Sequence, residues 1–147
     1  PEAAIPPAPS PDVKEAKWEK LAAGNGVRFG KPGLPPLISI ICDTAPGVAA
    51  NLRVVRNTPA DPGAQALFAF IGNSLVSRLK VDAVRNGNAW RWEGSFTPDD
   101  PKLDVFGGMG RVEATLPGGG TMELAASSLP RETLNQCRQA APHPQLG

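Results

Sequence analysis

Two cysteines and one histidine carry the most versatile chemistry in this 147-residue sequence. Cys42 and Cys137 could form a disulfide, remain as buried free thiols, bind a metal ion or supply a nucleophile. A metal site needs three or four ligands, and a nucleophilic thiol needs a partner such as histidine. His143, the single histidine, lies in a proline-rich tail and serves neither purpose well. We therefore predict a Cys42–Cys137 disulfide and an oxidising compartment, either the periplasm or the cell exterior.

Asp43 directly follows Cys42 at the end of an apolar run, in the order Asp43-Thr44-Ala45. This order is similar to the Asp-Thr-Gly turn of retroviral-type aspartic proteases, although Ala45 stands where that turn has glycine. Two such carboxylates must share a proton, so a dimer would be required. The plainer interpretation is that Asp43 begins a turn. Hydrolysis through Asp43 is kept as an alternative function.

Trp90, Arg91 and Trp92 form the main cluster that could bind a ligand or a partner. The two indoles could make an exposed platform for a sugar or a peptide, with Arg91 or Glu93 as the polar partner. The alternative is that both rings fill the core, because large aromatic side chains at positions i and i+2 of a strand usually pack together. The three residues are kept as a candidate ligand or partner surface.

Other clusters of polar or glycine residues have ordinary structural explanations. Asp99, Asp100 and Asp104 lack the ligand spacing of a calcium-binding loop and match the start of a helix instead. The glycine-rich segments 107–110 and 118–120 lack the lysine of a phosphate-binding loop, so they predict turns. We expect no catalytic residue, no metal site and no cofactor, and the enzyme class is disfavoured.

The composition excludes several classes of partner. Fifteen basic and fourteen acidic residues give a net charge of +1, so no basic field attracts nucleic acid. No apolar run approaches the roughly 20 residues that a membrane-spanning helix needs. The sequence begins with Pro1 rather than methionine, which fits the removal of a signal peptide. These features favour an exported protein with no transmembrane segment in this chain.

Four regions are expected along the chain. Residues 1–12 are rich in proline and predict an extended arm or linker. Residues 13–36 predict a short helix that ends near Gly24, followed by an irregular crossing. Residues 37–139 form a β domain closed by the disulfide, and residues 140–147 form a flexible tail.

The β domain is predicted to be all-β and mainly antiparallel, a small sandwich or barrel of about seven strands with a C-terminal helical turn. Asn86-Gly87 is the strongest hairpin signal, and the meander from Gln65 to Phe96 is the clearest unit. A single capped turn is expected over Pro101–Phe106. The expected strands are Leu37–Cys42, Asn51–Arg56, Gln65–Ile71, Ser74–Asp82, Asn88–Phe96, Arg111–Leu116 and Thr121–Ala125.

These features favour a non-catalytic, exported protein-binding or accessory subunit, with a protein partner docked through the Pro1 to Pro11 arm. The order of a first strand ending in Cys42-Asp43, a β meander and a last cysteine before Arg138 resembles the periplasmic inhibitors of C-type lysozyme, which are disulfide-closed β-barrels. The resemblance implies an inhibitor of a hydrolase as an alternative function. The tyrosine of that family's inhibitory loop has no counterpart, because this sequence contains no tyrosine.

Overall fold

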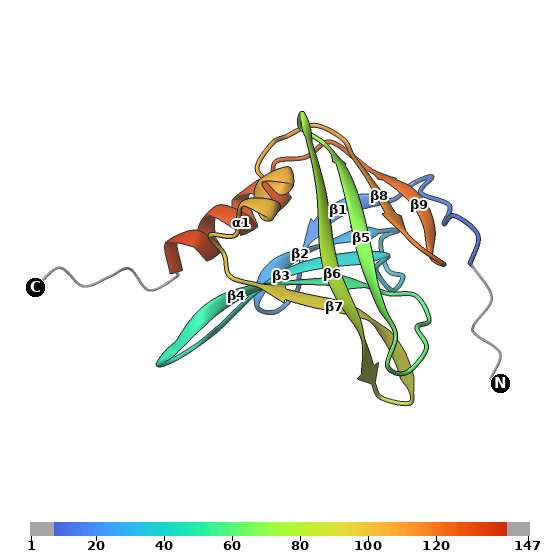
Figure 1. The fold of residues 1–147 in the computed structure, drawn as a ribbon. Helices are drawn as coiled ribbons and strands as arrows, with labels where there is room; N and C mark the ends of the chain where they lie inside the picture. Colours follow the sequence, from blue (N-terminus) through green and yellow to red (C-terminus); the bar gives the residue numbers. More distant parts are fainter. Residues whose placement is uncertain (1–7, 141–147) are drawn as a thin grey trace, which may run out of the picture.

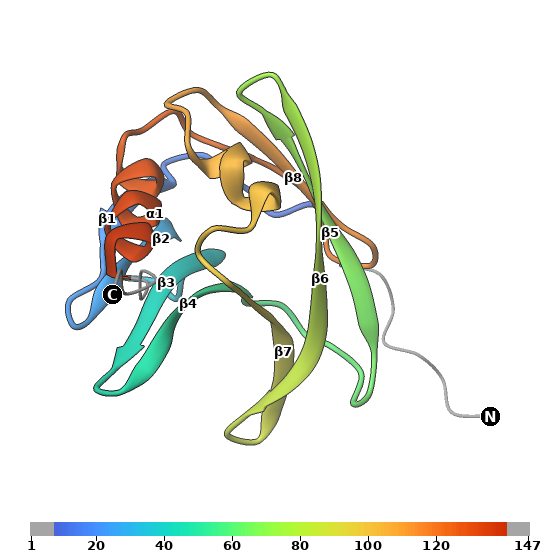
Figure 2. The same cartoon turned by 60° about the vertical axis from the view of Figure 1, so that its left-hand side comes forward.

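Nine strands form one antiparallel sheet that curls into a nearly closed barrel, in the order β1-β2-β3-β4-β7-β6-β5-β8-β9 (Figures 1 and 2). The computed structural model describes residues 8–140, so residues 1–7 and 141–147, including His143 and most of the predicted tail, lie outside the described part. The strands are β1 Lys17–Lys20, β2 Asn25–Gly30, β3 Ile38–Ala45, β4 Val48–Arg56, β5 Gln65–Gly72, β6 Leu75–Asn86, β7 Ala89–Phe96, β8 Val112–Leu116 and β9 Gly120–Leu124.

The predicted N-terminal helix is wrong, because its residues include strand β1, and strand β2 forms within the region predicted as an irregular crossing. Asp12 does accept a hydrogen bond from the backbone N–H of Lys14, as a helix cap would, but the chain continues as a turn. Tertiary burial overrides the helical spacing. Trp18 is buried against Phe29, with ring centroids 5.2 Å apart. A Cβ on Gly26 would lie 2.7 Å from the Ile40 carbonyl, so close strand pairing requires this glycine.

The sheet therefore has nine strands rather than seven, and the prediction of an antiparallel β fold is confirmed. The two additional strands extend the sheet beyond β3. The open ends of the barrel approach each other where the Trp18 indole N–H donates to the Ala125 carbonyl at 2.9 Å. The last residues of the proline-rich arm contact the other end of β9, at the β8–β9 turn, where the Ala8 N–H donates to the Gly118 carbonyl at 2.7 Å.

The predicted meander is confirmed as β5, β6 and β7, with each turn displaced by one residue from its expected position. Asn73 and Ser74 both have positive φ, as a type I′ turn requires. The second turn consists of Gly87 and Asn88, and Gly87 has a positive φ. The last hairpin, β8 and β9, is also confirmed.

Two short helices pack against the sheet (Figure 2). The 3₁₀ helix η1 spans Pro101–Phe106, as predicted, and Asp100 caps it by accepting from the Lys102 N–H at 2.9 Å. The α-helix α1 spans Leu129–Ala140 and contacts strands β1 to β4. Arg138 of α1 donates to Asp104 of η1 at 2.7 Å, so the two helices are joined.

The predicted disulfide is confirmed and joins Cys42 of β3 to Cys137 of α1. Both residues are buried, and Cys42 shares the inward-facing row of β3 with Ile38 and Ile40. The bond therefore attaches the last helix to the core of the barrel. A buried disulfide of this kind indicates an oxidising compartment.

Arg56 is a buried cation whose hydrogen bonds go to carbonyls of separate segments. It is 4% exposed, and burial lowers the pKa of its guanidinium from the usual value. Nη1 donates to the Leu37 carbonyl at 3.1 Å, and Nη2 donates to the Gly119 carbonyl at 3.2 Å. One side chain thus joins β4 to the β8–β9 hairpin across the barrel.

Removing the disulfide tests how much it stabilises the fold. In the chain-entropy model, a cross-link that spans 95 positions contributes roughly 4 to 5 kcal/mol. We expect the double variant Cys42→Ala, Cys137→Ala to lose about 4 kcal/mol of unfolding free energy, measured by urea denaturation. A loss under about 1 kcal/mol would show that the closed loop hardly restricts the unfolded chain.

The Arg56 bridge predicts a second stability change. Arg56→Met fills the space but removes the guanidinium donor of the Gly119 carbonyl and one of the two donors of the Leu37 carbonyl, which keeps the Asn57 N–H, so we expect a loss of about 2 kcal/mol. Arg85→Met, at an exposed arginine near the end of β6, is the matched control and should stay within about 0.5 kcal/mol of the original protein. Equal unfolding free energies for the two variants would refute the bridging role.

Candidate functional site: the open edge of strand β6

Part of one edge of β6 has no strand beside it. The ladder between β6 and β7 runs from Asp82 to Asn86, and β7 then leaves β6 to pair with β4. The β5–β6 hairpin closes on the pair Gly72 and Leu75, so alternate residues from Leu75 bond to β5. Val76 and Arg78 direct their backbone groups the other way. Among residues 8–140, no turn or loop backbone bonds to either of them.

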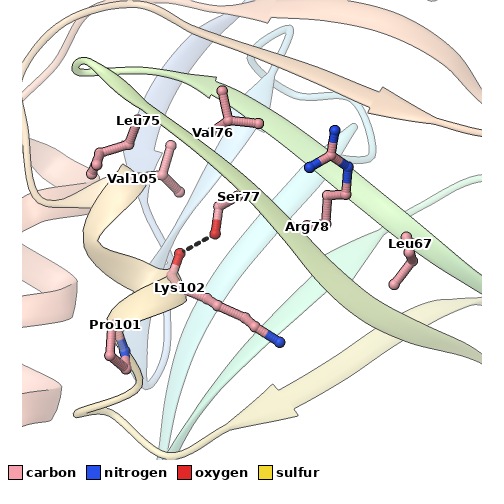
Figure 3. A pocket seen from close by; sticks show the side chains of 8 residues that line it. All are labelled: Leu67, Leu75, Val76, Ser77, Arg78, Pro101, Lys102 and Val105. Carbon is pink, nitrogen blue, oxygen red and sulfur yellow. Dashed lines mark hydrogen bonds between the residues drawn. The ribbon is translucent and has the colours of Figure 1, made fainter.

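A groove of about 480 Å³ runs along this edge. Helix η1 forms its other wall, and Figure 3 shows Ser77 directed at η1. The Ser77 hydroxyl donates to the Lys102 carbonyl at 2.5 Å, which fixes the distance between the two walls. The groove is lined by Leu67, Leu75, Val76, Ser77, Arg78, Pro101, Lys102 and Val105 (Figure 3).

The lining combines exposed apolar side chains with positive charge. Leu67, Leu75 and Val76 are 54%, 42% and 59% exposed, an unusual density of exposed aliphatic side chains on neighbouring strands. Arg78 and Lys102 are the charged residues of the lining, and neither makes an ion pair within the described part of the chain. The groove therefore offers aliphatic surface, unpaired backbone groups and free cations.

The residues singled out in the sequence lie elsewhere and on different faces. Trp92 is 8% exposed and belongs to the core, whereas Trp90 is partly buried at the end of β7. Arg91 points to the opposite face of the strand, where its Nε donates to Glu93 at 2.9 Å. Trp92 therefore does not share a surface with the other two, whereas Trp90 and Arg91 both line a cavity at the turn between β6 and β7.

Asp43 is held in an ion pair on the outer face of the sheet. Arg53 Nε donates to its Oδ2 at 2.8 Å, and the hydrogen bond to Asp43 raises the pKa of Arg53 above its usual value. Arg53 also reaches Glu93 at 3.3 Å, which links Asp43, Arg53, Glu93 and Arg91 in a chain of alternating charges. Such a network orders the surfaces of β3, β4 and β7. It does not bring a second acid beside Asp43 for proton sharing.

Sequence reasoning identified the alternation of β6 but not its free edge. Val76 stood out as an apolar residue among Arg78, Lys80 and Asp82 on the solvent-facing row. The edge depends on the divergence of β7 toward β4, which no local pattern encodes. The one sequence feature that could have indicated the open edge was Val76, an aliphatic residue on a row of otherwise charged residues.

Comparison with known proteins finds no matching family model, no similar curated protein and no similar solved structure. Within residues 8–140, no three histidine, cysteine, aspartate or glutamate residues gather in a group suited to a metal ion. Helices in the same part of the chain are too short or too polar to cross a membrane.

Hydrogen exchange tests the open edge directly. The Val76 and Arg78 amides should exchange rapidly, because no strand covers them. The Ser77 and Leu79 amides, which face β5, should be protected by the ladder. Residue-resolved NMR exchange measures all four amides in one sample. Equal protection of Arg78 and Leu79 would show that the edge is closed.

Proposed function

We propose that this protein is an exported, non-catalytic protein-binding or accessory subunit, acting in the periplasm or outside the cell. Its β6 edge would accept an extended segment of a partner protein as an added strand. The single observation that carries this proposal is the free backbone of Val76 and Arg78 beside a groove with exposed aliphatic walls. Strand addition draws affinity from main-chain hydrogen bonds and specificity from pockets for alternate side chains.

The alternation of inward-facing and outward-facing side chains along β6 determines which partner segment would suit this edge. Val76, Arg78 and Lys80 lie on the outward-facing row, while Ser77 faces η1. Side chains of an added strand lie opposite one row or the other. Acidic residues would face Arg78 and Lys80, and apolar residues would face the groove near Leu75 and Val105. The partner segment is therefore an extended peptide that alternates acidic and apolar residues.

The two walls of the groove are already joined in the free protein. The Ser77 bond to Lys102 ties η1 to β6, so the groove is formed before a ligand arrives. A preformed site avoids the cost of ordering the binding surface.

An inhibitor that captures an exposed strand of a hydrolase is one form of this activity. Hydrolysis through Asp43 has no observation in its favour, since Arg53 engages that carboxylate.

A synthetic peptide of sequence EVEVEVE tests strand addition. We expect it to bind and to protect the Val76 and Arg78 amides from exchange, whereas KVKVKVK should not bind, because its charges repel Arg78 and Lys102. Two versions methylated on alternate backbone nitrogens provide a further control. One version should lose binding and the other should retain it, because alternate N–H groups of a strand face one neighbour.

Matched variants locate the binding site. Arg78→Glu should weaken EVEVEVE binding about tenfold, which corresponds to 1.4 kcal/mol. Lys17→Glu removes an exposed cation from β1, remote from the groove, and should leave the affinity unchanged. Fluorescence anisotropy of labelled peptide measures both. Equal binding of the acidic and basic peptides, or equal effects of the two variants, would refute the proposal.

A further inference from the structure

A second cavity, of about 410 Å³, lies at the far end of β6. It opens between the segment 57–62 and the turn that joins β6 to β7. Asn86 lies ten positions beyond Val76 along β6, so the two sites are roughly 30 Å apart along the strand. Its volume falls within the range of small-molecule sites, about 300 to 1,000 Å³. No part of the β6 edge groove lines it.

Trp90 supplies an aromatic wall to this cavity. Its side chain is partly buried and packs against the core, so the ring is supported from behind. Its backbone carbonyl accepts from the Ala60 N–H at 3.0 Å, which fixes the segment that faces it. Within the described residues, the indole N–H has no hydrogen-bond partner and is not sealed from solvent. An indole N–H is a hydrogen-bond donor only, and because solvent can reach this one, it can donate to a ligand.

Three asparagines are among the residues that line the same cavity: Asn57, Asn86 and Asn88. In the described part of the chain, none of their side chains makes a hydrogen bond to protein. Their backbones are nevertheless fixed, since the Asn57 N–H donates to the Leu37 carbonyl at 3.0 Å and Asn86 ends the β6–β7 ladder. Each amide offers donors and an acceptor side by side, a pattern that suits a hydroxyl group.

The cavity carries little net charge. Arg91 is the one charged residue of its lining, and Glu93 accepts from Arg91 Nε at 2.9 Å. This ion pair offsets the positive charge next to the cavity, so an anion has little electrostatic advantage there. The other lining residues with polar side-chain groups are the three asparagines, Thr58 and Trp90, all of which are neutral. The chemistry favours a neutral ligand with many hydroxyl groups.

We propose that this cavity binds a neutral saccharide. The C–H face of a sugar ring would pack on the Trp90 indole, and its hydroxyls would exchange hydrogen bonds with the three asparagine amides. A proline-rich peptide would also fit an aromatic wall, but its ring nitrogens carry no N–H. It would leave the acceptor oxygens of the amides unused. The saccharide therefore satisfies more of the polar groups that the cavity presents.

Titration with neutral tetrasaccharides tests the proposal, with cellotetraose and chitotetraose as the probes. We expect at least one of them to bind at millimolar concentrations and to shift the NMR signals of the Asn57, Asn86 and Asn88 side-chain amides. Trp90→Leu retains an apolar group against the core but removes the flat ring. Asn88→Ala removes one amide. Each should weaken binding about tenfold, and thermal unfolding of each variant checks that it is folded.

Asn135→Ala, on the exposed face of α1, is the matched control and should bind like the original protein. Arg78→Glu should also leave saccharide binding unchanged, which separates this site from the β6 edge. The proposal is overturned if neither tetrasaccharide binds, or if the variants at Trp90 and Asn88 bind as well as the control. Binding of the peptide PEAAIPPAPSPD at the same amides, without saccharide binding, would reassign the cavity to proline-rich segments.

Discussion

Strand β7 pairs with only part of β6, and much of the structure follows from the divergence of these two strands beyond Asp82. Its eight residues are shared between two neighbours, five rungs with each, and Trp92 and Glu93 take part in both ladders. The first part of β6 is thereby left without a partner on one side. Helix η1 lies beside this gap and covers the interior with Leu103, Val105 and Phe106, but it supplies no strand ladder. An open edge and an enclosed core thus arise from the same divergence.

The barrel is stabilised by different means in different places. The disulfide and the packing of Leu134 attach α1 to the inner face of the sheet near β3. Elsewhere a single guanidinium, that of Arg56, connects the carbonyls of separated segments. A small domain buries a limited fraction of its surface, so such cross-connections matter more than they would in a larger one. Both devices restrain the curl of the sheet without using the outer surface of β5 and β6.

The sequence predicted those parts of the fold whose signals are local. The hairpin turns were readable because Asn73 and Gly87 favour the positive φ that tight turns need, and η1 was readable from Asp100 and Pro101. Strands β1 and β2 were missed because Trp18 and Phe29 become strand residues only when β3 is present to pair with them. The candidate sites depend on the same kind of distant information. Trp90 and Trp92 lie on the same row of β7, but Trp90 is closer to the end of the strand and is more exposed to solvent than Trp92.

The placement of the cysteines has a consequence for oxidative folding. Cys42 lies in β3 and Cys137 in α1, 95 positions later, so the bond cannot form until the whole β domain between them has been synthesised. With two cysteines in this sequence, one intramolecular pairing exists, and no disulfide isomerase is needed to correct a wrong one. Formation of the bond then reports that α1 has docked on the sheet. An oxidant that acts early would find Cys42 alone and could instead join two unfinished chains.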